Sequence, residues 1–541
     1  MMASSSSTSW KECFLFRYIR KLAPVGFKTE VKAVSRMAVP VILTSLMVFS
    51  VSLISTVFCG HLGKEELAGV ALAIAVINVT GISIGSGLSS ACDTLISQTF
   101  GSGNLMRVGV ILQRAILILI LACFPCWAIL INTEPILLAV GQEPNVARLS
   151  QLYVKIFMPA LPATFMYSLE TKYLQNQGII WPQVMTGFVV NILNALFNYI
   201  FIFALNLGVA GSALANTLSQ FSMAGVLYAY IIFKSVHKAT WGGWSKDCLQ
   251  DWGSFIHLAI PSMVMLCVEW WTFEIGSFLA GLISEVELGA QSIVYELSNV
   301  AFMFPLGFSV AGCVKVGNAL GAGDTKQAKL SAKTAFFCAV SVSVCLAAFI
   351  GSLRNHIAYA FTYDEQISIK VGEVVVFYAP FILMDAASVA MGGIIRGTGM
   401  QKVGAVCNVV CYYGVALPIG VPLMFAAKLG IIGLWTGLCT SVSLQCLFLV
   451  FYLVRMDWKK VTVEAQVRAG VCVNSDDTQS CEVQGDTTNL FDIDDPALMD
   501  PVERELAQSR LVLRRGVVLA LMLSILAAGI IMNILMTNRV T

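Results

Sequence analysis

Residues 261–300 read PSMVMLCVEWWTFEIGSFLAGLISEVELGAQSIVYELSNV, which is two apolar runs joined by a short polar connection. Glu269 and Glu274 lie within the first run, and Glu296 lies within the second. An acidic side chain at the centre of a bilayer opposes insertion by roughly 2.5–3.5 kcal/mol. Neither run contains a Lys or Arg that would neutralise these groups locally. Three carboxyl groups inside membrane spans therefore predict an interior cavity, protonation, or both.

The composition of the whole chain is that of a polytopic membrane protein. Of its 541 residues, 57% are apolar and only 12% are charged, whereas soluble chains carry about 25% charged residues. The apolar residues come in runs of about 20, the length that crosses a hydrocarbon core of about 30 Å. These runs predict a lipid bilayer as a partner. Because the formal net charge is only +2, we expect no nucleic acid as a partner.

The apolar runs predict thirteen helices. The predicted spans are 36–58, 70–98, 108–131, 151–173, 183–205, 209–233, 254–281, 288–313, 331–352, 372–395, 404–427, 430–455 and 516–536. They divide the chain into a cytosolic N-terminal tail (1–34), an N-lobe of helices 1–6 (35–235), a cytosolic inter-lobe linker (236–252), a C-lobe of helices 7–12 (253–456), a disordered cytosolic linker (457–513), and helix 13 with an extracellular C-terminus (514–541). The disorder is predicted from the polar, acid-rich composition of its segment. Helix 13 is either a lipid-facing anchor or, through its small residues, packed on a neighbouring helix.

The distribution of basic residues predicts the orientation in the membrane. With the N-terminus in the cytosol, most of the 34 Lys and Arg residues fall on the cytosolic side, as the positive-inside rule requires. The N-terminus lacks the long apolar core and cleavage site of a signal peptide. We therefore expect a multi-pass protein with a cytosolic N-terminus and an extracellular C-terminus.

An internal repeat is visible in the sequence at an offset of about 221 residues. The matched pairs are Pro40 and Pro261, Glu66 and Glu287, Gly101 and Gly321, Gly103 and Gly323, Pro159 and Pro380, Gly208 and Gly430, and Gly211 and Gly433. Because six helices return the chain to its starting side, the two halves are predicted to be parallel repeats about an axis along the membrane normal. We therefore expect two pseudo-symmetric six-helix bundles plus a thirteenth helix, which is a transporter architecture.

Carboxylates and aromatic rings alternate at the start of the C-lobe. Glu269 and Glu274 are about 140° apart around a helix, so on a straight helix they point to different places. Trp270, Phe273 and Tyr295 bring aromatic faces next to these acids. This combination binds organic cations through Coulomb attraction and cation–π contact, although the rings alternatively fill the core. A carboxyl group withdrawn from water favours its neutral form, so competition between a proton and a cation predicts antiport.

Other intramembrane polar residues extend this prediction. Asp385 is a fourth acid on the tenth span, and Asn78 is the best candidate in the first half. Asp93 and Glu170 lie near the predicted cytosolic side, where solvation or capping explains them better than function does. Asn78 begins a glycosylation sequon, but its position in a span favours a hydrogen-bonding role instead.

Several classes of function are disfavoured by what the sequence lacks. Cys123 and Cys126 form a CxxC without His or acidic neighbours, so they are interpreted as packing residues and not as a metal or redox site. The four His lie near span ends, so no catalytic constellation is expected and the protein is predicted not to be an enzyme. Pore-loop repeats of a channel are missing, and the two-lobed repeat argues against a receptor. No nucleotide-binding motif is present, so the proton is the expected coupling ion and no other cofactor is expected.

Several segments resemble the multidrug and toxin extrusion (MATE) transporters, and in particular the vertebrate proton/organic-cation exporters. The resemblance is carried by VFCGHLGKEEL, LAIAVINVTG, GLSSACDTLISQTFG, GSALAN, KATWGGWS, EWWTFEIGSF, VELGAQSIVYEL and VGNALGAGD. It implies two six-helix bundles around a central cleft, alternating access, and export of cationic drugs and metabolites in exchange for protons. It also implies the plasma membrane, at the apical face of epithelia, and we expect a monomer.

The resemblance also implies roles for individual residues. The residues expected to exchange the proton and the cation are Glu269, Glu274, Glu296 and Asp385, with Glu269 as the main site. Substrate binding falls to Asn78, Trp270, Phe273 and Tyr295. Close relatives carry Glu where this chain has Asp385, which is one methylene shorter. Two alternatives stay open, a sodium-coupled cation exporter and a lipid-linked sugar flippase, although a flippase needs a cationic cavity and this membrane interior is acidic.

Overall fold

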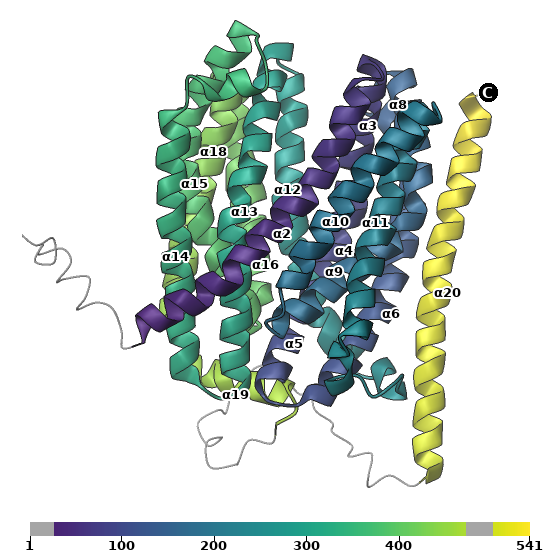
Figure 1. Cartoon of the computed structure of the whole chain (residues 1–541), viewed down its shortest axis with the longest axis vertical. Coiled ribbons are helices and arrows are strands. Elements are labelled where there is room, and N and C mark those ends of the chain that lie inside the picture. The colour runs from purple at the N-terminus through teal and green to yellow at the C-terminus, as the bar shows by residue number, and fades with distance from the viewer. Residues whose placement is uncertain (1–25, 472–500, 541) are drawn as a thin grey trace, which may run out of the picture.

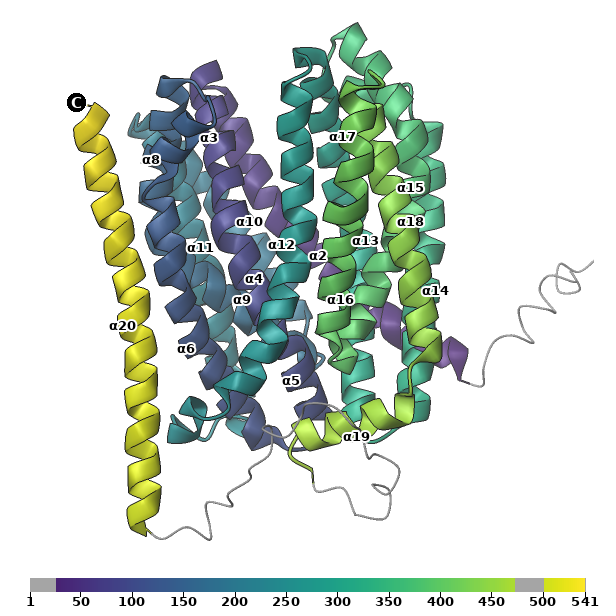
Figure 2. The same cartoon turned by 180° about the vertical axis from the view of Figure 1, so that it is seen from behind.

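The computed structural model describes residues 26–471 and 501–540, and of 501–508 and 537–540 only the backbone. The described residues form helices joined by short connections (Figure 1). Two bundles stand side by side, and one long helix, α20, lies outside the first bundle (Figures 1 and 2). The predicted all-α architecture of two six-helix bundles plus a thirteenth helix is therefore confirmed.

The helices of the N-lobe are α2 (Phe27–Gly60), α3 (Lys64–Ile77), η2 (Asn78–Ile82), α4 (Ser83–Ser89), α5 (Ala91–Gly101), α6 (Leu105–Leu130), α7 (Thr133–Ala139), α8 (Pro144–Phe157), η3 (Met158–Ala160), α9 (Leu161–Asn176), α10 (Trp181–Asn198), η4 (Tyr199–Ala204) and α11 (Gly208–Phe233). The linker holds η5 (Val236–Ala239) and η6 (Lys246–Leu249). Those of the C-lobe are α12 (Trp252–Gly281), α13 (Glu285–Gly321), α14 (Thr325–Ser352), η7 (Ile357–Ala360), α15 (Glu365–Thr398), α16 (Gln401–Asn408), η8 (Val409–Ala416), α17 (Leu417–Phe425) and α18 (Ile431–Arg455). Two helices follow, α19 (Trp458–Arg468) and α20 (Pro501–Val540).

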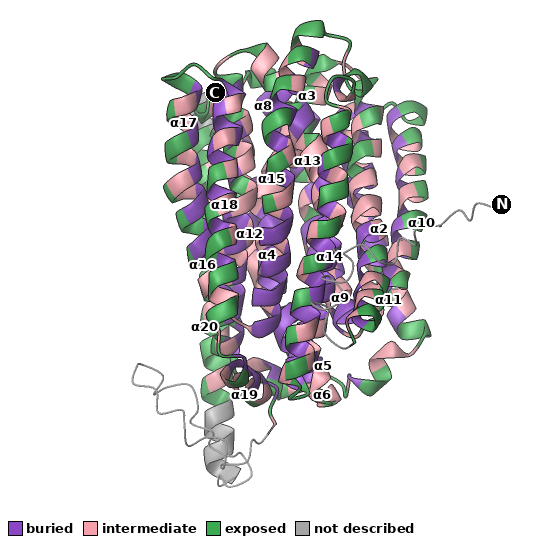
Figure 3. Ribbon diagram, turned by 90° about the vertical axis from the view of Figure 1, so that its left-hand side faces the viewer, coloured by how far each residue is buried: buried purple, intermediate pink, exposed green. Residues whose placement is uncertain are grey.

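Twelve segments of the described residues are long and apolar enough to cross a membrane, which confirms twelve of the thirteen predicted spans. The remaining span, α11, has 26 residues but carries buried Asn216, Thr217 and Ser219, which make it less apolar. It packs against α8, α9 and α10, so it completes the N-lobe bundle. Exposed residues cover the outside of the molecule (Figure 3). Many of them, such as Phe188 and Phe337, are large and apolar, as lipid contact requires.

The first helix of each lobe begins against the opposite lobe. α2 crosses the molecule obliquely (Figure 1), and Val34 and Ala38 in its first half pack with α13 and α14 of the C-lobe. Its second half packs on α10 of its own lobe. α12 makes the reverse crossing, because Phe255 and Leu258 lie in the N-lobe core. The lobes are therefore two packed bodies that exchange the first halves of their first helices.

An acidic residue at each crossing faces a base from the opposite lobe. Glu30 on α2 is only 6% exposed, and its Oε1 lies 3.0 Å from Nζ of Lys315 on α13. Asp251, at the matching repeat position, precedes α12, and its Oδ2 lies 3.9 Å from Nη2 of Arg114 on α6. The second pair is looser because Asp251 is largely exposed. Both pairs hold the start of a crossing helix to the other lobe.

The two lobes meet closely where α5 passes α13. A Cβ on Gly101 would collide with the backbone of Asn318, and a Cβ on Gly321 would collide with the backbone of Gln98. Gly101 and Gly321 occupy matching positions in the repeat, so pseudo-symmetry makes the same close contact twice. Only glycine permits this approach of two backbones. We call this region, formed by α5 and the last turns of α13, the closed end.

Other matched glycines adopt matched backbone conformations. Gly103 and Gly323 have φ of 81° and 80°, and Gly208 and Gly430 have φ of 58° and 59°. These values lie in the left-handed region that glycine adopts without steric cost. The structure therefore gives a physical reason for the glycine pairs of the repeat.

The predicted disordered linker, 457–513, is wrong at both of its ends. Its first part forms α19, whose Trp458 and Val461 pack on the C-lobe. Its last part already belongs to α20, which begins at Pro501. The residues between, 472–500, lie outside the described part of the chain. The prediction failed because it averaged composition over the whole segment and overlooked the short amphipathic helix at its start. The predicted tail, 1–34, likewise includes the first turns of α2.

The thirteenth helix, α20, packs against α6. Of the two predicted alternatives, the structure therefore shows packing on a neighbouring helix. Asn132 Nδ2 donates a hydrogen bond to the carbonyl oxygen of Gly529 at 2.9 Å. The lack of a side chain on Gly529 lets the two backbones approach, since a Cβ there would meet Ala128. Arg515 lies over the ring of Trp252, 4.3 Å from its centroid, in a cation–π contact. α20 is therefore docked specifically on the N-lobe side, although its surface is largely exposed.

Candidate functional site

Glu269 on α12 and Asp385 on α15 line one small cavity inside the C-lobe. The cavity has a volume of about 40 Å³, which is room for about one water molecule. The rest of its wall comes from Met265, Leu266, Ser388, Val389, Gly392, Ile395, Arg396, Gly404, Asn408, Tyr412, Gln445 and Leu449. The structure thus brings together two of the four predicted exchange residues.

Arg396 lies in the wall of the same cavity, and the sequence analysis missed it. It follows Asp385 by eleven residues, which is within about 20° of three full turns, so both side chains share one face of α15. Arg396 Nη2 donates to Ser309 Oγ at 3.1 Å, whereas its Nε is buried without a hydrogen-bond partner among the described residues. The cavity therefore contains two acids and one base. The same-face spacing was the signal that could have revealed it.

Amide side chains connect the helices around this cavity. Asn408 Nδ2 donates to the carbonyl oxygen of Met265 at 3.0 Å, and Gln445 Nε2 donates to Asn408 Oδ1 at 2.9 Å. These bonds join α16 to α12 and α18. Tyr412 comes from η8, a π-helical stretch, and such stretches are frequent at functional sites. The wall of the cavity is thus held by several helices that are distant in sequence.

The other two predicted acids form a second group. Tyr295 Oη donates to Glu274 Oε1 at 3.2 Å. Glu296 is exposed and lies close enough to Glu274 to repel it electrostatically. Neither acid lines the cavity of Glu269 and Asp385. The prediction that Glu269 and Glu274 point to different places is confirmed, and the four acids are two pairs.

Phe273 and Tyr295 belong to an aromatic cluster in the C-lobe. Their rings stack with centroids 5.9 Å apart, and Phe273 also contacts Phe381 at 6.5 Å and Trp435 at 6.2 Å. Phe273, Tyr295 and Trp270 are all only partly buried. Phe273 and Tyr295 therefore take part in the core of the C-lobe, and their role in binding a substrate stays a prediction.

Asn78 lies at the first position of η2, next to the helix that carries Glu269. Trp271 Nε1, on α12, donates to the carbonyl oxygen of Val79 at 3.1 Å, which links the two lobes at this point. Asn78 is partly buried and precedes Val79 in the same π-helical stretch. The predicted residue of the N-lobe thus lies next in sequence to a point of contact between the lobes.

The acids of the N-lobe have a different environment. Asp93 is 4% exposed, and its Oδ2 lies 2.8 Å from Nζ of Lys172, so the interpretation of a solvated residue is wrong. Glu170 has one buried carboxyl oxygen without a hydrogen-bond partner in the described ranges. Asp93 therefore serves the packing of α5 on α9.

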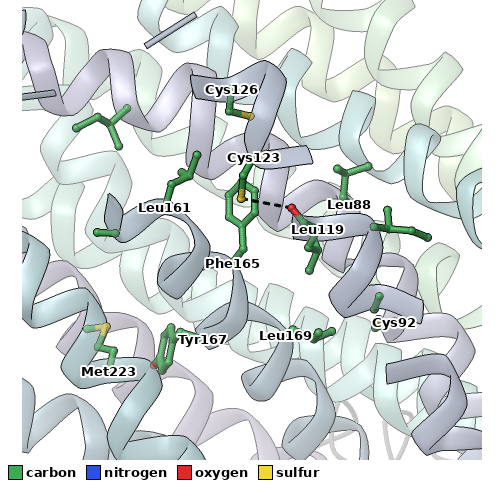
Figure 4. Close-up of a cluster of buried hydrophobic side chains, with 14 of the residues drawn as sticks. Leu88, Cys92, Leu119, Cys123, Cys126, Leu161, Phe165, Tyr167, Leu169 and Met223 are labelled. Atoms are coloured by element: carbon green, nitrogen blue, oxygen red, sulfur yellow. Dashed lines mark hydrogen bonds between the residues drawn. The ribbon is translucent and has the colours of Figure 1, made fainter. Parts of the chain in front are cut away.

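The CxxC cysteines lie in the N-lobe core, as expected for packing residues. Cys123 and Cys126 are each 1% exposed and surrounded by apolar side chains (Figure 4). Cys123 Sγ donates to the carbonyl oxygen of Leu119 at 3.4 Å (Figure 4). Among the side chains that the structure describes, residues 26–471 and 509–536, no group of three His, Cys, Asp or Glu residues is placed to hold a metal ion.

Comparison with known proteins gives consistent results. The profile of the MatE family matches twice, over residues 40–200 and 261–421, and the starts of these matches are separated by the offset of the repeat. Multidrug and toxin extrusion protein 1 of Danio rerio is 59% identical over 557 residues, which cover 98% of this chain and 94% of that protein. The Homo sapiens protein of the same name is 55% identical over 450 residues, which cover 83% and 79%. The crystal structure of the eukaryotic MATE transporter AtDTX14 superposes with a TM-score of 0.79 at 28% identity, covering 82% of this chain and 100% of that one.

Proposed function

Because the chain belongs to the MatE family of multidrug and toxin extrusion transporters, we propose that it exports organic cations in exchange for protons. The observation that supports this coupling most directly is the cavity that Glu269 and Asp385 share. Two carboxyl groups in one small cavity favour binding of a positive species, since like charges withdrawn from bulk water repel strongly. The proton is the proposed coupling ion, and no other cofactor is invoked.

In the proposed mechanism, proton and cation compete for the same charge. The ionised acids attract an organic cation to the C-lobe, where Trp270, Phe273 and Tyr295 offer ring surfaces. Protonation removes that attraction and releases the cation. Arg396 in the cavity wall stabilises the ionised forms of Glu269 and Asp385. The net charge of the cavity then depends on whether each of these two acids carries a proton. Glu274 and Glu296 add negative charge near the substrate, outside the cavity.

The two lobes supply alternating access. The crossing helices α2 and α12 connect the lobes, and the closed end is the contact that must separate when the molecule opens on that side. From the positive-inside rule we assign the closed end to the cytosol and the C-terminus to the outside. The proposed location is the plasma membrane, at the apical face of epithelia.

The test is uptake of a fluorescent organic cation into sodium-free proteoliposomes with an imposed pH gradient. We expect uptake into vesicles with an acidic lumen and its collapse by a protonophore. Glu269→Gln should abolish this uptake. Glu365→Gln, the same change at an exposed position of the C-lobe, should not affect it. Normal pH-driven uptake by Glu269→Gln at equal protein content would contradict the proposed exchange site.

Sodium coupling is the second outcome that this experiment distinguishes, because carboxylates also bind sodium. Uptake that needs an opposing sodium gradient, and fails with a pH gradient alone, would replace the proton by sodium. Uptake under neither gradient would contradict the cation exporter as a whole.

A further inference from the structure

The short helix α19 contacts both lobes at the closed end, and its two sets of contacts differ in chemistry. Its apolar residues Trp458, Val461 and Ala465 join a buried cluster with residues of α13, α14 and α15. Thr462 Oγ1 also lies 2.7 Å from Thr325 Oγ1 at the start of α14. The apolar face of α19 is therefore fixed to the C-lobe.

The contacts of α19 with the N-lobe are polar. Arg468 Nη1 donates to Gln98 Oε1 on α5 at 2.7 Å. Asn104 Nδ2, directly after α5, donates to the carbonyl oxygen of Ala469 at 3.3 Å. Gln98 is 1% exposed, and its own Nε2 donates to the carbonyl oxygen of Gly397 at 2.9 Å. These bonds lie beside the close approach of the two lobes at Gly321.

Arg468 holds both lobes with one guanidinium group. While Nη1 binds Gln98, Nη2 donates to the carbonyl oxygen of Thr398, the last residue of α15 in the C-lobe, at 3.3 Å. Glu464 Oε2, one turn earlier on α19, lies 3.7 Å from Nη2 and keeps the side chain oriented. The Arg468 side chain is only 18% exposed, so little water competes for these bonds. A planar guanidinium is suited to such a two-sided contact, whereas a Lys ammonium is not.

We infer that α19 is a latch of the transport cycle, in which Arg468 and Gln98 are positioning residues that hold the closed end shut. When the lobes separate there, the apolar contacts keep α19 on the C-lobe and the polar contacts to α5 break. The latch stabilises the state with a closed cytosolic end and has no role in binding the substrate. The inference rests on the proposed alternating-access transport, but it concerns a different part of the molecule from the acid cavity.

The test measures the separation of the lobes directly. Spin labels introduced by orthogonal chemistry at Met106 on α6 and Lys326 on α14, both exposed, report the distance across the closed end. Arg468→Ala should raise the ratio of open to closed molecules about tenfold, as the loss of a charge-assisted hydrogen bond does. Arg468→Lys should give a smaller rise in the ratio of open to closed molecules, because it keeps the positive charge and loses the planar guanidinium that contacts both lobes. Lys459→Ala, which removes a charge from the exposed start of α19, is the matched control and should give none.

A double-mutant cycle separates the latch from a general weakening of the fold. Arg468→Ala and Gln98→Ala should be non-additive if the two side chains act through one bond. Cation binding should remain dependent on pH in both variants, because the acid cavity is intact. An unchanged distance distribution in folded Arg468→Ala, or full additivity, would overturn the latch. If instead the protein takes up no organic cation under either gradient while the distances shift as expected, the proposed function fails and the latch stands.

Discussion

The two lobes share a fold and a repeat, yet their cores carry different polar chemistry. In the C-lobe, Glu269, Asp385 and Arg396 surround a cavity. In the N-lobe, the polar residues of the core include neutral amides and hydroxyls. There Asn194 Nδ2 donates to Ser219 Oγ at 2.9 Å, and Asn198 Nδ2 donates to Asn194 Oδ1 at 3.1 Å. Pseudo-symmetry therefore extends to the backbone and the crossing helices, whereas two acids and a base share one cavity in the C-lobe and the buried Asp93 of the N-lobe is paired with Lys172.

The largest effect is expected from neutralising the C-lobe cavity. Asp385→Asn keeps the shape of the side chain and removes its titration. A proton gradient drives transport only if the two conformational states of the transporter bind protons with different affinity. Because the amide introduced by Asp385→Asn binds no proton in either state, pH-driven uptake should fall about a hundredfold. The measurement is proteoliposome uptake at equal protein content. Retained uptake would show that Glu269 alone provides the coupling and that the pairing of acids is not needed.

The next effect tests the symmetry itself. Gly321→Val and Gly101→Val each place a branched side chain against the backbone of the opposite lobe. Overpacking of this kind costs about 1–3 kcal/mol, so both variants should lose roughly tenfold in uptake and should populate the open state at the closed end. Gly225→Val, on an exposed face with free space around it, is the control. A defect in only one of the two variants would break the proposed equivalence of the lobes at this contact.

A smaller effect should follow from removing the base of the cavity. Arg396→Gln deletes a positive charge beside the acids, which favours their neutral forms. Cation binding, measured with equal pH on both sides of the membrane, should then need more alkaline conditions, and its midpoint should move up by about one pH unit. Arg354→Gln, at an exposed site of the same lobe, should leave the midpoint unchanged. An unchanged midpoint would mean that Arg396 does not face the acids during the cycle.

The smallest effect on transport is expected in the N-lobe. Asn194→Ala removes the hydrogen bonds that the Asn194 side chain makes with buried Ser219 and Asn198, which costs about 1–3 kcal/mol of stability in total. Thermal unfolding in detergent should detect the loss, while the pH midpoint of cation binding should not move. A changed pH midpoint would place part of the proton chemistry in the N-lobe and would weaken the contrast between the lobes.

Much of the fold followed from simple patterns. Runs of about twenty apolar residues predict spans because backbone polar groups must be satisfied within a helix in lipid. The repeated glycines predicted the pseudo-symmetry. The left-handed backbone conformation that Gly208 and Gly430 share explains why glycine recurs at these positions. α19 escaped prediction because eleven residues with a few apolar positions give a weak signal inside a polar segment.

The candidate site was predicted less completely than the fold. The acids were visible because a charge in an apolar run is rare and costly. Their division into Glu269 with Asp385 and Glu274 with Glu296 was not visible, since it depends on how α12, α13 and α15 pack. Arg396 was overlooked because bases were sought only in the two spans that carry the three glutamates.

The membrane architecture, the internal repeat and the charged groups within the spans could be predicted because hydropathy and residue type are local properties of the chain. Which acids share a cavity, that Arg396 joins them, and that α2 and α12 start on the opposite lobe became visible in the packed structure. The same structure also shows that α19 reaches across to α5. The physical reason is that charge interactions and close backbone contacts depend on distances between helices far apart in the sequence, and these distances are set by the packing of both lobes together.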